Sequence, residues 1–399
     1  MGIGLCTLTV SARALGPDGR GAYAACISWA AILALCFSCS VGRVALKKAS
    51  TSQNMKDWVP EALSAGIIFS SAGSILSILA ALLISKIAPN VLGEVNGGLI
   101  PFMLVLIPLQ VWSQFKNVVL LTTNQINIRS IAQISASCTV FCMMLILVVG
   151  FKMGPKGLLT AYLSGELVSA FLGSRKIWHL AGGTRWKLST VNMRYWFWSG
   201  LKLHPNAVSS VVRAQTDILM LNAILTPAAV GIYQLASRLI DVMMVFPNAT
   251  SGAMMAQVAG EDINSLWFKQ KQIMMRIMGL VLIMSIFAYL VVPFLIPIIF
   301  GQKFEASGEV FRWLLPILIG KSIGGMMISQ ILGRGYFIQA SILGVIVTGV
   351  NIALNWILIP RYGMMGAVYA TLSSYAGVTI IINSVYIYLI DKRAKRNEV

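Results

Sequence analysis

The stretch LGPDGRGAY at 15–23 recurs in outline as LTPAAVGIY at 225–233, with Leu, Pro, Gly and Tyr at the same spacing. A second pattern, GxxGxxxAxLS, begins at Gly154 and again at Gly363, displaced by almost the same number of residues. Because both patterns recur at almost the same distance along the chain, they predict that the second half of the chain is a duplicate of the first. In a membrane protein, repeats that run in the same direction form bundles related by an axis along the membrane normal, and the substrate path lies where they meet.

The composition predicts a membrane protein. Hydrophobic residues make up 57% of the chain and charged residues 11%, whereas a soluble domain has roughly 25% charged residues. Stretches of about 20 mostly apolar residues are long enough to cross the hydrocarbon core as helices. We therefore expect an all-α polytopic membrane protein with about twelve transmembrane helices in two six-helix bundles.

The expected bundles are residues 1–174 and 197–399, joined by a basic and aromatic connector at 175–196. The first span is short, because few residues precede Arg13, and this predicts either a truncated first helix or a start site placed too late in the sequence. No expected loop has room for a catalytic domain outside the membrane. The later spans are expected near 22–46, 62–85, 97–122, 129–151, 156–174, 197–222, 228–257, 273–299, 308–332, 336–359 and 364–390.

The distribution of Lys and Arg predicts the orientation. Basic residues are more frequent in the loops after even-numbered spans and in the tail at 392–396. The positive-inside rule then places both termini in the cytoplasm. This topology also accounts for the net charge of +18 without nucleic acid, since a nucleic-acid partner requires a soluble basic face or a known binding fold.

The connector alternates aromatic and basic side chains from Arg175 to Trp198. Such a segment is typical of the headgroup interface, although a direct role in substrate binding is the alternative. Cys36 and Cys39 form one C-x-x-C, which without a second pair or a nearby His is weak evidence for a metal site. We expect no metal and no bound cofactor.

Two acid–base pairs lie inside the expected spans of the second half. Arg213 and Asp217 are four residues apart, and Arg238 and Asp241 are three apart, so each pair shares one helical face. A charge inside the membrane faces protein, water or a partner and is a candidate functional group. The alternative is that each pair only neutralises itself within its helix.

Four further ionisable residues fall inside or at the end of spans: Arg43, Lys116, Glu166 and Lys321. The long side chains of Arg43 and Lys116 can reach the headgroups, and this simpler reading is favoured for both. Lys321 lies too deep in its span for that, which favours a cavity-facing role. Glu166 is either protonated and silent or exchanges a proton during transport.

Three segments carry a resemblance to a known family: RALGPDGRGAY at 13–23, DILMLNAILTPAAVGIY at 217–233 and NWILIPRYGMMGAVYAT at 355–371. They resemble the polysaccharide-biosynthesis membrane proteins, the O-antigen type repeat-unit flippases of the multidrug/oligosaccharidyl-lipid/polysaccharide (MOP) exporter superfamily. The resemblance covers nearly the whole chain through loose motifs of Gly, Pro and Tyr. It implies two six-helix bundles around a central cavity. Family members usually have a longer first span than this chain.

The resemblance implies a flippase that carries a polyprenyl-pyrophosphate-linked oligosaccharide across the cytoplasmic (inner) membrane by alternating access. Such a protein is not an enzyme, and its product enters O-antigen, lipopolysaccharide, capsule or exopolysaccharide assembly. The pyrophosphate needs cations, for which Arg is well suited, and the tail stays among the membrane lipids. Proton or sodium coupling is expected, together with a polysaccharide polymerase and a chain-length regulator as partners. The expected pyrophosphate residues are Arg213, Arg238, Lys321, Arg43 and Lys116, and the expected ion-coupling residues are Asp217, Asp241 and Glu166.

Two alternatives stay open from the sequence. A cation-coupled drug antiporter of the same fold should carry acidic or aromatic groups in its cavity, whereas Arg and Lys predominate here. A membrane polysaccharide polymerase should carry a long periplasmic loop or an acidic metal-binding cluster.

Overall fold

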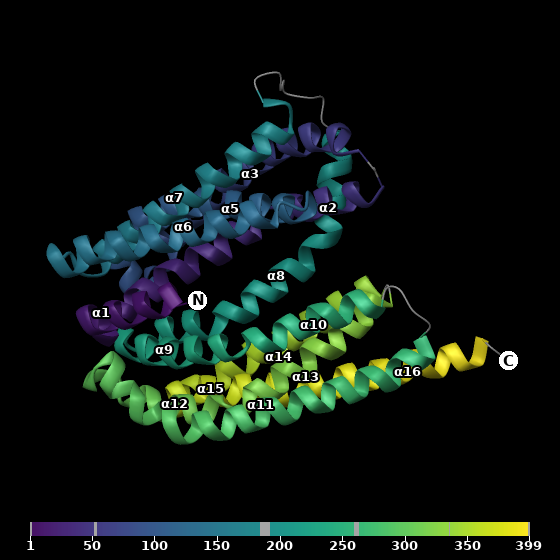
Figure 1. The fold of residues 1–399 in the computed structure, drawn as a ribbon. Coiled ribbons are helices and arrows are strands. Elements are labelled where there is room, and N and C mark those ends of the chain that lie inside the picture. The colour runs from purple at the N-terminus through teal and green to yellow at the C-terminus, as the bar shows by residue number, and fades with distance from the viewer. Residues whose placement is uncertain (1, 52–53, 184–191, 259–262, 335, 398–399) are drawn as a thin grey trace. The chain divides into compact units, whose positions relative to one another are not determined.

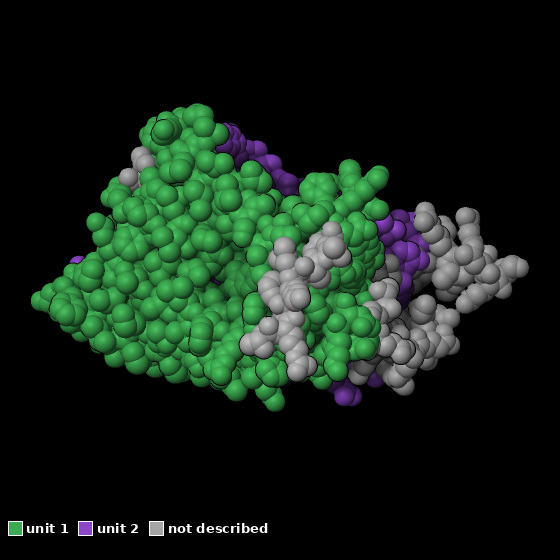
Figure 2. Space-filling model, turned by 90° about the horizontal axis from the view of Figure 1, so that it is seen from above, with its two compact units in different colours: residues 1–215 green, residues 216–399 purple. Residues whose placement is uncertain are grey.

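The computed structural model describes residues 2–51, 54–183, 192–258, 263–334 and 336–397, and every regular element among them is helical (Figure 1). The all-α prediction is thereby confirmed. The chain divides into two compact units, unit 1 (Met1–Gln215) and unit 2 (Thr216–Val399), which Figure 2 colours separately. The division falls inside helix α8 (Met193–Ile224).

Unit 1 contains the first half of the chain and the larger part of α8. Its core combines small residues of the first helix with larger apolar side chains such as Met103, Leu106 and Ile107. Small residues let helix backbones approach closely, which is the main source of helix packing in a membrane. Its elements before α8 are α1 (Gly2–Cys36), α2 (Val41–Thr51), α3 (Met55–Ile87), α4 (Pro89–Leu92), η1 (Gly93–Gly97), α5 (Ile100–Thr122), α6 (Ile126–Met144), the π-helix η2 (Leu145–Gly150) and α7 (Gly154–Leu180).

Unit 2 begins in α8 and contains a similar run of helices. Its elements after α8 are α9 (Pro227–Met243), α10 (Val245–Val258), α11 (Ile263–Phe300), η4 (Gln302–Phe304), α12 (Ala306–Leu314), α13 (Pro316–Gly333), α14 (Phe337–Tyr362), α15 (Met364–Leu372), the π-helix η5 (Ser373–Val378) and α16 (Thr379–Asn397).

Seven helices among the described residues are long and apolar enough to cross a membrane, or up to nine when each of two bent pairs counts as one span. The bent pairs are α9 with α10 and α12 with α13, each bent by 47°. The expected spans 228–257 and 308–332 are therefore broken rather than straight. The expected span 22–46 is also broken, because α1 ends at Cys36 and α2 begins at Val41.

The first copy of the repeated motif breaks α1 into two helical segments. Gly16 has φ 67° and ψ −176°, a conformation that favours glycine. Pro17 then starts the second segment, much as Pro227 starts α9. Arg20 Nη1 donates a hydrogen bond to Ser11 Oγ at 3.0 Å, and residues nine apart would lie about 13.5 Å apart along a straight helix. The kink brings them together.

The second repeated motif has the same geometry in both units. Gly154 and Gly363 have φ of 62° and 59°, and each precedes or starts a helix, α7 and α15. A Cβ on Gly157 would lie 3.2 Å from the carbonyl oxygen of residue 147, and a Cβ on Gly366 would lie 2.2 Å from that of residue 358. In each unit the second glycine thus permits the helix to pack against the backbone of the preceding helix. The two sequence matches correspond to two matching local structures.

The expected connector is partly helical. Helix α7 continues to Leu180 and α8 begins at Met193, while 184–191 lie outside the described residues. Trp178 and Trp198 are exposed, as an interfacial segment requires. Trp196 is instead fully buried, and its Nε1 donates a hydrogen bond to Glu61 Oε1 at 2.7 Å.

Candidate functional site

The break between α1 and α2 organises the candidate site of unit 1. Cys39 and Ser40 both have φ of 48°, in the left-handed region that residues with a side chain rarely adopt. The imidazole of His204 holds both ends of this turn. Its Nε2 lies 2.9 Å from the Cys36 carbonyl oxygen, and its Nδ1 lies 3.0 Å from Ser40 Oγ.

Two glycines let neighbouring helices reach the same turn. A Cβ on Gly200 of α8 would lie 2.2 Å from the carbonyl oxygen of Cys39, and a Cβ on Gly73 of α3 would lie 2.5 Å from that of Phe37. No real Cβ approaches a backbone atom so closely, so any larger residue would displace the turn.

Replacing Gly200 by alanine is therefore expected to lower the free energy of unfolding by about 1–3 kcal/mol through overpacking. The matched control is Gly279→Ala, because a Cβ on that helical glycine would meet nothing within 4 Å. Thermal denaturation of the purified variants in detergent measures the difference. Equal melting temperatures for the two variants would show that the turn does not depend on this close approach.

The turn opens on a cavity of about 340 Å³ within unit 1. Its wall combines one cation and several hydroxyl and amide groups with a larger number of apolar side chains. Arg43 supplies the cation from α2 and is half-buried. The other polar side chains that line the cavity are Ser38, Ser40, Ser70, Ser210, Gln114 and Gln215. Gln215 also accepts a hydrogen bond from Ser28 Oγ at 2.7 Å, which fixes its amide.

Lys116 and Glu166 occupy a different, buried place in unit 1. Lys116 is 1% exposed, and its Nζ donates a hydrogen bond to Ser169 Oγ at 2.6 Å. Glu166 accepts a hydrogen bond from Ser113 Oγ at 2.9 Å and interacts electrostatically with Lys116. Lys116 thus does not extend toward the headgroups, and binding to a substrate would require this side chain to become accessible.

Three of the predicted residues come together in unit 2. Asp241 Oδ2 lies 3.7 Å from Arg238 Nη1, and its Oδ1 lies 3.8 Å from Lys321 Nζ. The Lys321 ammonium also lies 5.1 Å from the centre of the Tyr375 ring. The Arg238–Asp241 pair expected within α9 is present, and Lys321 of α13 joins it. About half of the Arg238 and Asp241 side-chain surface is exposed, so the cluster is open to a ligand.

Asp217 lies in a separate, buried polar cluster of unit 2. Its carboxylate accepts three hydrogen bonds, from Tyr233 Oη at 2.6 Å, Thr371 Oγ1 at 2.7 Å and Asn355 Nδ2 at 2.8 Å. Asn355 is fully buried, and its Oδ1 has no hydrogen-bond partner among the described residues. A carboxylate beside hydroxyl and amide oxygens is a ligand set that suits a small cation.

The sequence reasoning missed Tyr233, Thr371 and Asn355 as partners of Asp217. The sequence did hold a clue to this cluster. Asp217 and Tyr233 are the ends of the segment 217–233, and Asn355 and Thr371 are the ends of the segment 355–371, and both segments carry the family resemblance. His204 and Gly200 had no such signal, because their role depends on the turn at 37–40.

Comparison with solved structures identifies proteins of the same fold. The chain is similar to a multidrug resistance MATE family transporter of the MOP superfamily in its inward-facing conformation, with a TM-score of 0.73, 17% identity and coverage of 97% of this chain and 95% of that chain. It is also similar to a MOP superfamily transporter from Pyrococcus furiosus, described as having a binding pocket of reverse polarity, with a TM-score of 0.64, 16% identity and coverage of 97% and 92%. The chain therefore has the fold of these solved membrane proteins.

The sequence comparisons identify the family of the chain. The chain belongs to the polysaccharide biosynthesis protein family, whose profile matches residues 1–255. It is also 28% identical over 181 residues to the probable low-salt glycan biosynthesis flippase Agl15 of Haloferax volcanii. That match covers 41% of this chain and only 36% of the length of the relative. The resemblance inferred from the sequence segments is confirmed.

Proposed function

We propose that this protein is a flippase that moves polyprenyl-pyrophosphate-linked oligosaccharide repeat units across the cytoplasmic membrane for O-antigen, capsule or exopolysaccharide assembly. Its family membership and transporter fold support a role in glycan export. About twelve spans in two bundles, with both termini in the cytoplasm, would alternate between the two sides of the membrane. The protein would act without a catalytic residue, alongside a polymerase and a chain-length regulator.

The cavity of unit 1 is the observation that carries this proposal. A pyrophosphate needs a cation with directed donors, and Arg43 supplies a planar guanidinium at the cavity wall. A glycan needs many neutral hydrogen-bonding groups, and serine hydroxyls with two glutamine amides line the same wall. Arg213 lies on α8, the helix that supplies Gln215 to the cavity.

The cluster of unit 2 is a second candidate site for the pyrophosphate. Arg238 and Lys321 share the single carboxylate of Asp241, so the group carries a net positive charge. An incoming diphosphate would compete with Asp241 for both cations, and charge-assisted bonds to phosphate are strong. Asp241 would then keep the cations in place between transport cycles.

Replacing Lys321 by glutamine is expected to reduce export of surface polysaccharide at least about tenfold, because one charge-assisted hydrogen bond contributes roughly 1.5–3 kcal/mol. Quantifying surface polymer in a null strain complemented with the variant provides the measurement. Lys303→Gln is the control, since Lys303 is an exposed lysine of the same unit. Normal polymer from the Lys321 variant at wild-type protein level would remove this residue from the mechanism.

The Asp217 cluster is our proposed site for the coupling proton or sodium ion. It offers a carboxylate, two hydroxyls and the unpartnered Asn355 Oδ1 inside the helices of one unit. Such intramembrane carboxylates commonly exchange a proton or bind an ion. Asp241 and Glu166 are secondary candidates, because Asp241 lies beside the cations of Arg238 and Lys321 and Glu166 interacts with the cation of Lys116.

Deleting the gene in its host tests the proposed function. Loss of a flippase should leave lipid-linked repeat units on the cytoplasmic face of the membrane. Loss of a polymerase should instead leave single repeat units on the cell surface. Loss of a drug antiporter should change only the sensitivity to toxic cations, with polymer at its normal level. Either of the last two results would contradict the proposal.

A further inference from the structure

A groove of about 700 Å³ lies on unit 2, between α11, α12 and the start of α13. It follows the 47° bend at which α12 passes into α13. Its volume falls in the range of sites that hold a small organic ligand, about 300–1,000 Å³. The groove lies outside both the Asp217 cluster and the Asp241 cluster, so the proposed transport function does not account for it.

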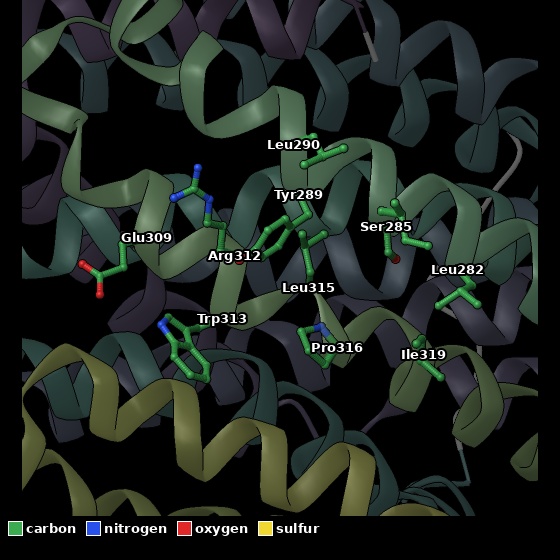
Figure 3. A pocket seen from close by; sticks show the side chains of 11 residues that line it. Leu282, Ser285, Tyr289, Leu290, Glu309, Arg312, Trp313, Leu315, Pro316 and Ile319 are labelled. Carbon is green, nitrogen blue, oxygen red and sulfur yellow. The ribbon is translucent and has the colours of Figure 1, made fainter.

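One end of the groove is apolar. Leu282, Ile286 and Ile319 line it, and Figure 3 shows Leu282 and Ile319 at the end away from the charged side chains. The neighbouring surface of α11 is strongly apolar as well, with Ile283 67% exposed and Phe287 66% exposed. On a helix long enough to cross the bilayer, such exposure is a contact with lipid chains.

The other end of the groove carries two opposite charges. Glu309 and Arg312 both lie on α12, three residues apart, and Figure 3 shows them together at this end. The Arg312 guanidinium lies 5.4 Å from the centre of the Tyr289 ring and 5.9 Å from that of Phe294, which holds the side chain against α11. Within the part of the chain that the structure describes, Arg312 forms no ion pair, so its charge stays available to a ligand.

We propose that this groove binds one zwitterionic phospholipid of the phosphatidylethanolamine type. One acyl chain lies along the apolar wall, the phosphate contacts Arg312, and the ammonium contacts Glu309. A lipid with only negative charge fits less well, because its headgroup would meet the Glu309 carboxylate. Trp313, 48% exposed at the same end, suits the boundary between chains and headgroups.

Native mass spectrometry of the full-length protein, delipidated in detergent, tests this assignment. Phosphatidylethanolamine and phosphatidylglycerol with identical acyl chains are titrated separately. The wild-type protein is expected to bind phosphatidylethanolamine about tenfold more tightly than phosphatidylglycerol. Glu309→Gln should abolish this preference, while Arg312→Gln should weaken binding of both lipids about tenfold because both carry the phosphate.

The matched controls are Glu305→Gln and Lys303→Gln, exposed residues of the neighbouring segment that do not line the groove. Both controls should keep the wild-type preference. Should Arg312→Gln fail to fold, the exposed Glu309 variant still decides the question. The proposal is overturned if the wild-type protein binds the two lipids equally, if Glu309→Gln keeps the preference, or if polyprenyl phosphate displaces phosphatidylethanolamine at equal concentration.

Discussion

Replacing Asp217 by leucine is expected to lower the free energy of unfolding by about 3 kcal/mol or more. The change leaves the donors of Tyr233, Thr371 and Asn355 without their acceptor inside the protein, and each unpartnered buried donor costs about 1–3 kcal/mol. Titration with a denaturing detergent, followed by circular dichroism, measures the loss. Asp217→Asn keeps the shape and one acceptor oxygen, so it should fold better than the leucine variant yet fail to transport if the carboxylate carries the coupling ion.

The loss of hydrogen bonds to Asp217 can be distinguished from general damage to the core as the cause of the lower stability. Tyr233→Phe and Thr371→Val remove two of the three donors, so combining them with Asp217→Leu should cost less than the sum of the separate changes. Additive costs would show that the hydrogen bonds to Asp217 are not the origin of the effect. Asp57→Asn, at an exposed carboxylate of α3, is the control for transport.

Replacing Arg43 by glutamine is expected to weaken binding of polyprenyl pyrophosphate by about tenfold to a hundredfold. The guanidinium at the cavity wall of unit 1 supplies two parallel donors and a full charge, and hydrogen bonds to a charged group contribute about 1.5–3 kcal/mol. Arg43→Lys keeps the charge but loses the paired donors. Its affinity for the lipid should therefore fall between that of the wild type and that of Arg43→Gln. Equilibrium titration of the purified protein with the lipid gives the dissociation constants.

Arg175→Gln is the matched control for this experiment, because it removes an exposed arginine from the same unit. Its affinity should equal that of the wild type. If Arg43→Gln and Arg175→Gln bind the lipid equally well, the cavity of unit 1 is not the pyrophosphate site.

The repeated glycine motifs could be recognised in the sequence because their role is to allow a backbone conformation within the motif itself. Gly154 and Gly363 each adopt a positive φ before the same kind of helix, and the residue pattern reflects that backbone need directly. Intramembrane charges were readable for a similar reason, since a charge in an apolar span is costly wherever the helix lies. Asp217, Asp241 and Lys321 all occupy polar clusters of unit 2.

The turn at 37–40 was not readable, because nothing in Phe37, Ser38, Cys39 or Ser40 is a usual helix breaker. The turn depends instead on His204 and Gly200, which approach it from a helix far along the chain. The burial of Lys116 has the same origin. The methylene stem of Lys116 packs against Gly173, where an added Cβ would lie 2.4 Å from Lys116 Cδ. This close approach is created by the tertiary structure and leaves no local pattern in the sequence.

The most direct test of the central claim is translocation by the purified protein in liposomes. A polyprenyl-pyrophosphate-linked oligosaccharide is placed in both leaflets, and a glycan-cleaving enzyme added outside reports how much of it becomes accessible. We predict that wild-type protein exposes nearly all of the lipid-linked glycan, whereas Arg43→Gln exposes the inner half about tenfold to a hundredfold more slowly and liposomes without protein leave it protected. Equal protection in wild-type and protein-free liposomes, with and without proton and sodium gradients, would contradict the proposed function.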